Sequence, residues 1–345
     1  MRTTILTTLL CLSVGLVSGQ EFSKKNLMLT EMKSKNLAEA PKKMFIKSFK
    51  IYYQMIAEAE TTAQGGRQLG GNYVGSATAR MAVGVEGIDP EHLQKMTNEL
   101  YEYYIGELKS KGYEIYTADN LPSNEYFEGW TKIDGPNINE EQIQGSLMVI
   151  PEGFSYFVKR ITNKGKEKTG AFMSGVTGDD GSFSSSFYGP NPKLSDELDD
   201  MFVVDVSFNV PSIWLSANNK LGSAKIKGGP NLKISQAKIS YISGKANKPG
   251  VAYPDKAVET ILKEAIPING VFKDEQFKSV ATRSHTYVPS YASYFSVENK
   301  SIEVTNTIEC DPDQYQSEVK KPIMGFMNKS FELLQTGLNG EKVKL

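Results

Sequence analysis

The sequence predicts an α+β protein with a mixed or mainly antiparallel sheet and a few packed helices. Segments that alternate apolar and polar residues, as half-buried strands do, recur along most of the 345 residues. Two segments with helical spacing stand among them, and each opens with an Asp-Pro pair, at Asp89-Pro90 and at Asp311-Pro312. Tyr and Phe number 17 and 16, which suits the aromatic core of a sheet-rich protein.

The first residues have the three parts of a secretory signal peptide. Arg2 precedes an apolar run over residues 5–17, and the small residues Ser18 and Gly19 follow. That run is too short to span a bilayer, and no later run approaches the roughly 20 apolar residues of a transmembrane helix. We therefore expect residues 1–19 to be a cleaved signal peptide. The mature protein is then secreted or periplasmic, with no transmembrane segment.

Cysteine usage fits export without a disulfide framework. Cys11 lies inside the signal peptide, and Leu9-Leu10 before it are not the small residues that lipid attachment requires. Cys310 is then the only cysteine of the mature chain, so no intramolecular disulfide can form. We expect Cys310 to be a buried small hydrophobic residue or a site of intermolecular pairing.

The charge balance argues against a nucleic-acid partner. Basic residues number 39 and acidic residues 40, which gives a net charge of −1. Proteins that bind nucleic acid or anionic membranes through charge carry a basic excess or a basic patch. The sequence therefore predicts no nucleic-acid binding, whereas a protein partner or a small ligand stays open.

Composition divides the mature chain into five stretches. A polar, lysine-rich leader over residues 20–43 precedes a first α+β half over 44–170 and a loop-rich linker over 171–200. A second α+β half covers 201–338, and a polar tail covers 339–345. The repeated Asp-Pro helix start suggests two similar halves, although common capping chemistry explains the repetition more simply.

The first half is expected to begin with a β-hairpin. Residues 44–62 alternate apolar and polar side chains, as a long strand does, and 77–85 are the returning strand. The glycine-rich turn at 64–71 lies between them. It lacks the Gly-Lys-Ser/Thr ending of a phosphate-binding loop and opens no helix, so a hairpin tip is the expected structure.

The clearest helix begins at Asp89. Asp89 can cap it, Pro90 fits its first position, and Gly112 ends it before a strand over 113–116. Its apolar face, spaced at three and four residues, comprises Leu93, Met96, Thr97, Leu100, Tyr101, Tyr104 and Leu108.

The remaining elements follow from the same patterns. Strands are expected over residues 147–150, 154–161, 201–214, 225–227, 233–243, 287–298 and 301–309. Residues 174–192 are rich in Gly and Ser and predict a surface loop, and the turn at 228–230 would join two strands as a hairpin. A shorter helix is expected over 255–266. A longer one begins at Asp311, and Pro322 should kink or split it.

Histidine, the residue of most acid–base and metal sites, indicates no site here. His92 falls in the first turn of the Asp89 helix, on its surface, and His285 precedes a strand. Neither belongs to a triad, HExxH or CxxC motif. We therefore assign no catalytic residue, no ligand-binding residue, no metal site and no cofactor.

Acidic residues gather in one region of the sequence. They are Asp179, Asp180, Asp196, Glu197, Asp199, Asp200 and Asp205. Two facing carboxylates can hydrolyse a glycan, whereas the spacing around Asp179 does not match a calcium-binding EF-hand loop. A solvated acidic loop ahead of a buried strand is the simpler interpretation. Ordinary strand packing, or a groove for a glycan or lipid, would account for the aromatic residues Tyr287, Tyr291, Tyr294 and Phe295.

One segment resembles a known group of exported proteins. Residues 77–115 read as a strand, Gly-Ile-Asp-Pro, a helix and Gly-Tyr-Glu-Ile. This order resembles the strand–helix–strand opening of periplasmic assembly proteins such as the TolB amino-terminal domain and the curli-secretion lipoproteins. The overall sequence pattern also resembles that of exported, uncharacterised proteins of Bacteroidota. The resemblance implies a location in the envelope and carries over no functional residue. The curli lipoproteins have a lipobox that this chain lacks.

These observations favour an exported, non-enzymatic protein that binds or assembles with a component of the cell envelope. The partner would be an envelope protein or a small apolar or glycan ligand. Two alternatives stay open. A carboxylate-dependent glycan hydrolase would place two acids face to face in an aromatic-lined cleft, and a carrier of an apolar ligand would enclose an apolar pocket. The sequence does not indicate the oligomeric state.

Overall fold

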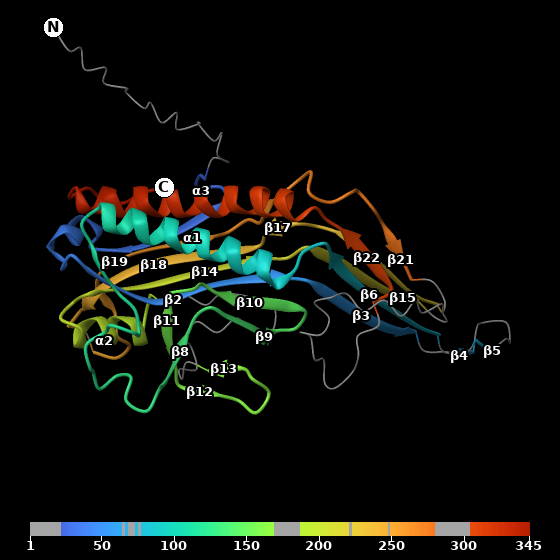
Figure 1. The fold of residues 1–345 in the computed structure, drawn as a ribbon, viewed down its shortest axis with the longest axis horizontal. Helices are drawn as coiled ribbons and strands as arrows, with labels where there is room; N and C mark the ends of the chain where they lie inside the picture. The colour runs from blue at the N-terminus through green and yellow to red at the C-terminus, as the bar shows by residue number, and fades with distance from the viewer. Residues whose placement is uncertain are drawn as a thin grey trace, which may run out of the picture.

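A mixed eight-stranded sheet forms the centre of the fold (Figure 1). The computed structural model describes residues 22–63, 66–67, 73–74, 77–168, 187–220, 223–247, 249–279 and 304–345. Seven strands follow one another in the order β1 (Leu27–Met32), β19 (Pro254–Leu262), β18 (Gln236–Lys245), β14 (Phe202–Val210), β2 (Lys43–Gln54), β10 (Ser146–Ile150) and β9 (Asn137–Ile143). The eighth, β7 (Glu114–Tyr116), pairs with the beginning of β2. The predicted α+β class is confirmed.

The pairing in this sheet is antiparallel except around β2. Strand β2 runs parallel to β14 and to β7, whereas it pairs antiparallel with β10. Strand β14 is buried along almost its whole length, as a central strand is. The two expected halves, 44–170 and 201–338, therefore contribute adjacent blocks of strands to one sheet, and the blocks meet where β14 pairs with β2.

Two long helices cover one face of the sheet (Figure 1). Helices α1 (Pro90–Ser110) and α3 (Pro312–Leu338) pack against each other. The seven residues predicted for the apolar face of α1 are all buried. The Tyr104 ring of α1 stacks on Phe331 of α3 at a centroid distance of 5.2 Å and lies 5.9 Å from Phe49 of β2. Aromatic packing of this kind fixes both helices on the sheet.

Both helices begin as their Asp-Pro pairs predict. Asp89 and His92 form a capping box at α1, and the Asp311 carboxylate accepts a 2.8 Å hydrogen bond from the first turn of α3. Pro322 lies inside α3, yet α3 continues as one helix of 27 residues. Of the two expected effects, a kink or a split, the split does not occur, because packing of the buried face of α3 holds the helix together where proline removes a hydrogen bond.

A third helix packs on the opposite face of the sheet. Helix α2 (Pro190–Glu197) contacts β14 and β18. Its first residues fall in the stretch 174–192 that was expected to be a loop. Pro190 and Pro192 occupy the first turn, where a proline loses no helical hydrogen bond, so they open the helix instead of preventing it. The apolar cluster beneath it comprises Phe45, Phe127, Leu194, Leu198, Met201 and Val203.

Three small β pairs complete the body of the protein. These are β8 (Thr131–Asp134) with β11 (Ser155–Val158), β12 (Arg160–Ile161) with β13 (Glu167–Lys168), and β17 (Lys233–Ile234) with β20 (Ile266–Pro267). The strand expected over 154–161 is thus divided between two of these pairs.

A two-layered β structure, here called the β arm, projects beyond the helices (Figure 1). One layer contains β3 (Ile56–Ala63), β6 (Ala77–Glu86) and β22 (Asn306–Glu309), and the other contains β15 (Ile213–Lys220), β16 (Ser223–Pro230) and β21 (Phe277–Lys278). Strands β4 (Gly66–Arg67) and β5 (Tyr73–Val74) extend the first hairpin. Strand β15 packs along β3, and β16 packs against β6.

The strand expected over 44–62 divides at Met55. The N–H groups of Met55 and Ile56 both donate to the Gly145 carbonyl, at 2.8 and 3.0 Å. Gly145 has a φ of +72°, and a Cβ added to it would lie 2.1 Å from the Ile56 carbonyl oxygen. Strand β2 therefore ends in the central sheet, and β3 continues into the β arm, where it pairs with β6 as the sequence predicts.

The hairpin expected at residues 228–230 is wrong. These residues belong to β16, which pairs with β15 and not with β18. A Cβ added to Gly228 would lie 3.2 Å from the Met81 sulfur of the other layer, so the glycine permits close approach of two layers and marks no turn. The strand expected over 201–214 likewise divides at Pro211 into β14 and β15.

The helix expected over residues 255–266 is also wrong, because most of this segment is strand β19. Strand β19 pairs with β18 on one side and with β1 on the other, so it lies inside the sheet. Val258, Ile261 and Leu262 have helical spacing, but the branched side chains of the segment suit a pleated surface with two neighbours. Pairing with distant strands overrides the local pattern here.

The expected leader and tail both pack on the body. Strand β1 forms an edge of the central sheet, and the 3-10 helix η1 (Ser34–Glu39) follows it with Leu37 fully buried. In the tail, Val343 is 1% exposed and its N–H donates to the Ser34 hydroxyl at 3.1 Å. The polar residues that mark the expected leader and tail in the sequence are the outer residues of these segments. The predicted signal peptide lies outside the described residues.

Candidate functional site

Charged side chains form a buried band on the sheet face opposite α1 and α3. This charged band comprises Lys47 and Lys50 of β2, Asp205 of β14, Lys238 of β18, Glu259 of β19 and Glu167 of β13. Side chains alternate along a strand, and the neighbours of Asp205 in sequence belong to the helix-side core, so Asp205 faces away from it. Asp205, Lys238 and Glu259 are 5%, 4% and 0% exposed. Buried charges are tolerated only when they are paired, so their contacts decide what the band can do.

The strand register brings opposite charges together. Asp205 and Glu259 both lie opposite Ser240 of β18, one from each neighbouring strand. Lys238 lies two residues before Ser240 on the same face, so it is diagonal to both carboxylates. Burial lowers the pKa of Lys238, and the two carboxylates offset only part of that effect.

Lys47 and Asn191 hold Asp205 as a carboxylate. Lys47 Nζ lies 3.2 Å from Asp205 Oδ2, and Asn191 Nδ2 donates to the same oxygen at 2.6 Å. Lys47 also donates to Asn191 Oδ1. Burial raises the pKa of Asp205, but Lys47 and Lys238 outweigh burial and keep that pKa below its ordinary value. Because Asn191 belongs to α2, this contact also attaches α2 to the sheet.

Glu167 accepts hydrogen bonds from three sides. The donors are Lys50 Nζ at 2.8 Å, the Tyr156 hydroxyl at 2.6 Å and Asn139 Nδ2 at 3.3 Å. Lys50 Nζ also lies 4.3 Å from the centroid of the Tyr156 ring, a cation–π distance. Burial raises the pKa of Glu167, but Lys50 and the other donors lower it below the ordinary value. Burial and the Glu167 charge raise the pKa of Tyr156.

The pKa shifts of Asp205, Glu167 and Tyr156 keep these three groups in one protonation state at neutral pH. A general acid or base works best when its pKa is near the working pH. The pKa values of Asp205 and Glu167 move down, away from neutrality, and that of Tyr156 moves up, also away from it. The two carboxylates therefore act as lasting acceptors and Tyr156 as a lasting donor. These three groups suit the attachment of β13 and α2 to the sheet better than proton transfer.

The acidic residues that the sequence groups together are separated in the structure. Asp205 belongs to the charged band, so the solvated loop expected for it is wrong. Asp196 is exposed as expected and lies 2.6 Å from Lys245, but it belongs to helix α2 and not to a loop. Asp179 and Asp180 lie outside the described residues. Within the described part of the chain, no group of three or more His, Cys, Asp or Glu residues is placed to hold a metal ion.

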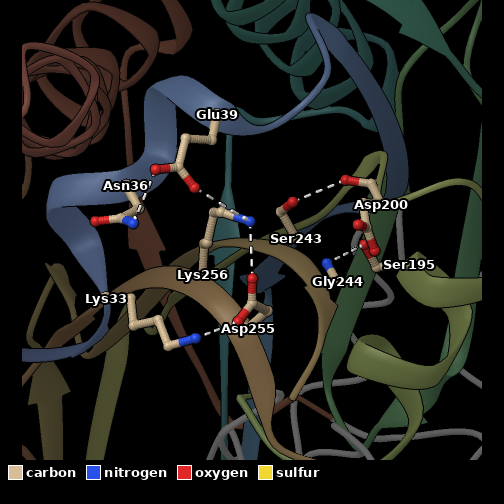
Figure 2. A network of polar contacts seen from close by, with 9 residues as sticks. All are labelled: Lys33, Asn36, Glu39, Ser195, Asp200, Ser243, Gly244, Asp255 and Lys256. Carbon is tan, nitrogen blue, oxygen red and sulfur yellow. Dashed lines mark hydrogen bonds and ion pairs between the residues drawn. The ribbon is translucent and has the colours of Figure 1, made fainter. Parts of the chain in front are cut away.

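Figure 2 shows the corner where α2 meets the end of β18. The Ser195 hydroxyl oxygen accepts from the Gly244 N–H at 2.7 Å and donates to the Met201 carbonyl at 2.6 Å. The Ser243 hydroxyl donates to the Asp200 carbonyl at 2.8 Å. Asp200 has a φ of 61°, in the left-handed region, so the chain turns sharply here from α2 into β14. These contacts give the segment from Ser195 to Asp200 a structural role.

The same corner attaches η1 to the beginning of β19 (Figure 2). Lys256 Nζ lies 2.7 Å from Asp255 Oδ2 and 4.0 Å from Glu39 Oε2. Lys33 Nζ lies 2.6 Å from the other Asp255 oxygen. Hydrogen bonds from Lys256 and Lys33 lower the pKa of Asp255. A carboxylate shared by two lysines therefore joins the segment after β1 to the sheet.

His92 and Cys310 both lie in the described part of the chain, where their contacts are structural. His92 Nδ1 accepts a 3.2 Å hydrogen bond from the Asp89 N–H, so His92 helps to cap α1. Cys310 is half-buried, its sulfur lies 3.4 Å from the Asp311 carbonyl, and burial raises the pKa of its thiol to about 12. Such a thiol is poorly ionised at neutral pH. His285 and the aromatic group at 287–295 lie outside the described residues.

Sequence reasoning missed the charged band. Lys47 and Lys50 lie in an alternating segment, where lysines normally face water, and residues 164–168 form a short charged run that suggests a turn. One signal was available. Asp205 interrupts the apolar run from Phe202 to Phe208, and a charge inside such a run indicates a buried partner.

Comparisons with protein-family models, curated proteins and solved structures give no significant match to this chain. Among the described helices, none combines the length and the apolar character needed to cross a membrane.

Proposed function

We propose that this chain is an exported, non-enzymatic protein that binds or assembles with a component of the cell envelope, and that the β arm contacts the partner. The observation that carries this proposal is the projection of the β arm beyond the helix-covered body (Figure 1). A projecting pair of layers presents its outer faces and edges to a partner beyond the body of the protein.

The side chains of the β arm support a contact role. Ala57 and Ala59 line the inner side of β3, opposite Val83 and Met81 of β6, which are 0% and 1% exposed, so the two layers enclose a packed apolar interior. The outer side of β3 presents Glu58, Glu60 and Thr62 to solvent. Polar outer residues on a rigid β scaffold can make specific hydrogen bonds with a partner at little conformational cost.

Site-specific photo-crosslinking in the host cell tests this proposal. A photoreactive amino acid is placed at Glu58 or Asn218, which are exposed on the β arm, and at Glu102, which is exposed on α1. We expect discrete adducts from both β-arm positions and none from Glu102. Equal adducts from all three positions, or none from any, would contradict a role for the β arm.

A further inference from the structure

Strand β1 forms an open edge of the central sheet. It pairs with β19 over all six of its residues, from Leu27↔Leu262 to Met32↔Ala257, and no strand pairs with its other side in the described part of the chain. Edge strands with unpaired backbone groups attract further strands, and proteins usually protect them with proline, a bulge or an inward-pointing charge. The register of β1 with β19 is continuous, and β1 contains no proline.

The backbone groups that point outward from β1 can be identified. The Lys263 N–H donates to the Asn26 carbonyl at 2.8 Å, so Asn26 faces β19. Backbone groups of successive residues alternate in direction along an antiparallel pair. The N–H and C=O groups of Leu29 and Glu31 therefore point away from β19, and the described residues supply no backbone partner for them.

The side chains of β1 are suited to apolar contact. Met28 is 47% exposed, which is high for a large apolar residue in a sheet. Leu29, on the other face, packs against the main core and is only partly buried. A strand added beside β1 would cover apolar surface on both faces of the sheet while pairing the outward groups of Leu29 and Glu31.

Both ends of β1 carry positive charge. Lys24 and Lys25 precede it, and Lys35 follows it. All three side chains are exposed, and none forms an ion pair within the described residues. Nearby Lys33 and Lys342 differ, because Asp255 and Glu31 neutralise them. An incoming strand with acidic residues at its ends would meet these free cations.

We propose that β1 is a docking edge for an extended segment of a partner protein, with apolar residues at its centre and acidic residues at its ends, which adds as a further strand. A second copy of this chain fits less well. Antiparallel pairing of two β1 strands would bring Lys24 and Lys25 of one copy near Lys35 of the other, and like charges across strands are destabilising. The proposal rests on the binding role proposed above, but it concerns a different surface from the β arm.

A fluorescein-labelled peptide of sequence Asp-Glu-Val-Thr-Val-Thr-Val-Glu-Asp tests this docking edge. Fluorescence anisotropy with the mature protein should give saturable binding with a dissociation constant of roughly 1–100 μM. The same peptide with lysine at its four acidic positions should not bind. Absence of saturable binding by the acidic peptide would overturn the proposal, whatever crosslinks the β arm forms.

Two matched pairs of variants locate the binding to β1. Leu29→Pro removes an outward N–H while sparing the hydrogen bonds to β19, and it should weaken peptide binding roughly tenfold or more. Leu29→Ala keeps the N–H, so its affinity for the peptide should stay within about threefold of that of the unchanged protein. The triple change Lys24→Glu, Lys25→Glu and Lys35→Glu should also weaken binding about tenfold, and Lys95→Glu on α1 should not. Circular dichroism and the thermal midpoint establish that each variant is folded.

Two results would overturn the proposal even if the peptide binds. Equal affinity of Leu29→Pro and Leu29→Ala would place the peptide elsewhere. A dimer in sedimentation equilibrium that Leu29→Pro abolishes would identify a second copy of this chain as the occupant of the edge.

Discussion

The Tyr156 hydroxyl donates a 2.6 Å hydrogen bond to the Glu167 carboxylate, although the two residues belong to different small β pairs. Lys50 of β2 lies 2.8 Å from the same carboxylate. These three side chains therefore join β11 and β13 to the central sheet. Because Tyr156 is 1% exposed and Glu167 is 6% exposed, water cannot replace a lost partner at little cost.

Removal of the Tyr156 hydroxyl should destabilise the protein measurably. Tyr156→Phe takes one donor from a buried carboxylate and should lower the free energy of unfolding by about 1.5–3 kcal/mol. Lys50→Met leaves Glu167 without its cation and should lower it by about 3–5 kcal/mol. Urea denaturation measures both. Tyr188→Phe, at a position 43% exposed, is the control and should have little effect. Equal stability of Tyr156→Phe and the unchanged protein would show that the bond contributes nothing.

Acid should destabilise the fold through the carboxylates of the charged band. The pKa values of Glu167 and Asp205 are lower in the folded protein than their ordinary values, which the unfolded chain approaches. Stability from these groups is therefore present above about pH 4 and is lost as the pH falls through the folded pKa values.

The Glu167→Gln variant isolates one of these contributions. It should be less stable than the unchanged protein at neutral pH, and the difference should shrink as the pH falls below about 4. Urea denaturation at several pH values between about 7 and 3 measures this. A difference that stays constant across the range would contradict ionisation of Glu167 as the cause.

The elements that the sequence predicts well are those with local start and stop signals. Helix α1 has Asp89 at its start and Gly112 after its end, and both act as the sequence indicates. Helix α3 begins at its own Asp-Pro pair. Strand β19 has no such signal. Its helix-like spacing is overridden by pairing with β1 and β18, and β1 itself lies in a segment whose composition suggests a leader.

The charged band could not be predicted because it depends on register between distant strands. Asp205 meets Lys47 only because β14 runs parallel to β2, with Ser48 opposite Asp205. Glu167 reaches Lys50 from a hairpin that is more than a hundred residues away in sequence. Local patterns report whether a residue is in a strand, but they do not report its neighbours.

Gly244 should not tolerate a side chain. Its φ is +69°, and a Cβ added to it would lie 2.8 Å from Asp200 Oδ1 and 3.2 Å from Asp255 Cβ. Gly244→Ala should therefore lower the free energy of unfolding by about 1–3 kcal/mol. Gly106→Ala is the control. Gly106 lies on the exposed side of α1 with nothing within 4 Å of its added Cβ, so alanine should stabilise the helix by about 0.5–1 kcal/mol. Thermal unfolding measures the stability of both variants. A change of the same sign in the two variants would contradict this account.

The segment around η1 should behave as part of the core and not as a removable leader. Leu37 is 0% exposed. A Cβ added to Gly337 of α3 would lie 2.3 Å from Leu37 Cδ1, so η1 and α3 are closely packed. Leu37→Ala should leave a cavity at this contact and lower the free energy of unfolding by about 2–5 kcal/mol. Lys35→Ala, an exposed change in the same helix, should alter it by less than about 0.5 kcal/mol. Urea denaturation measures both, and equal stability of the two variants would mean that residues 34–39 detach without cost. In that case the expectation of a leader ahead of the fold would hold for this segment after all.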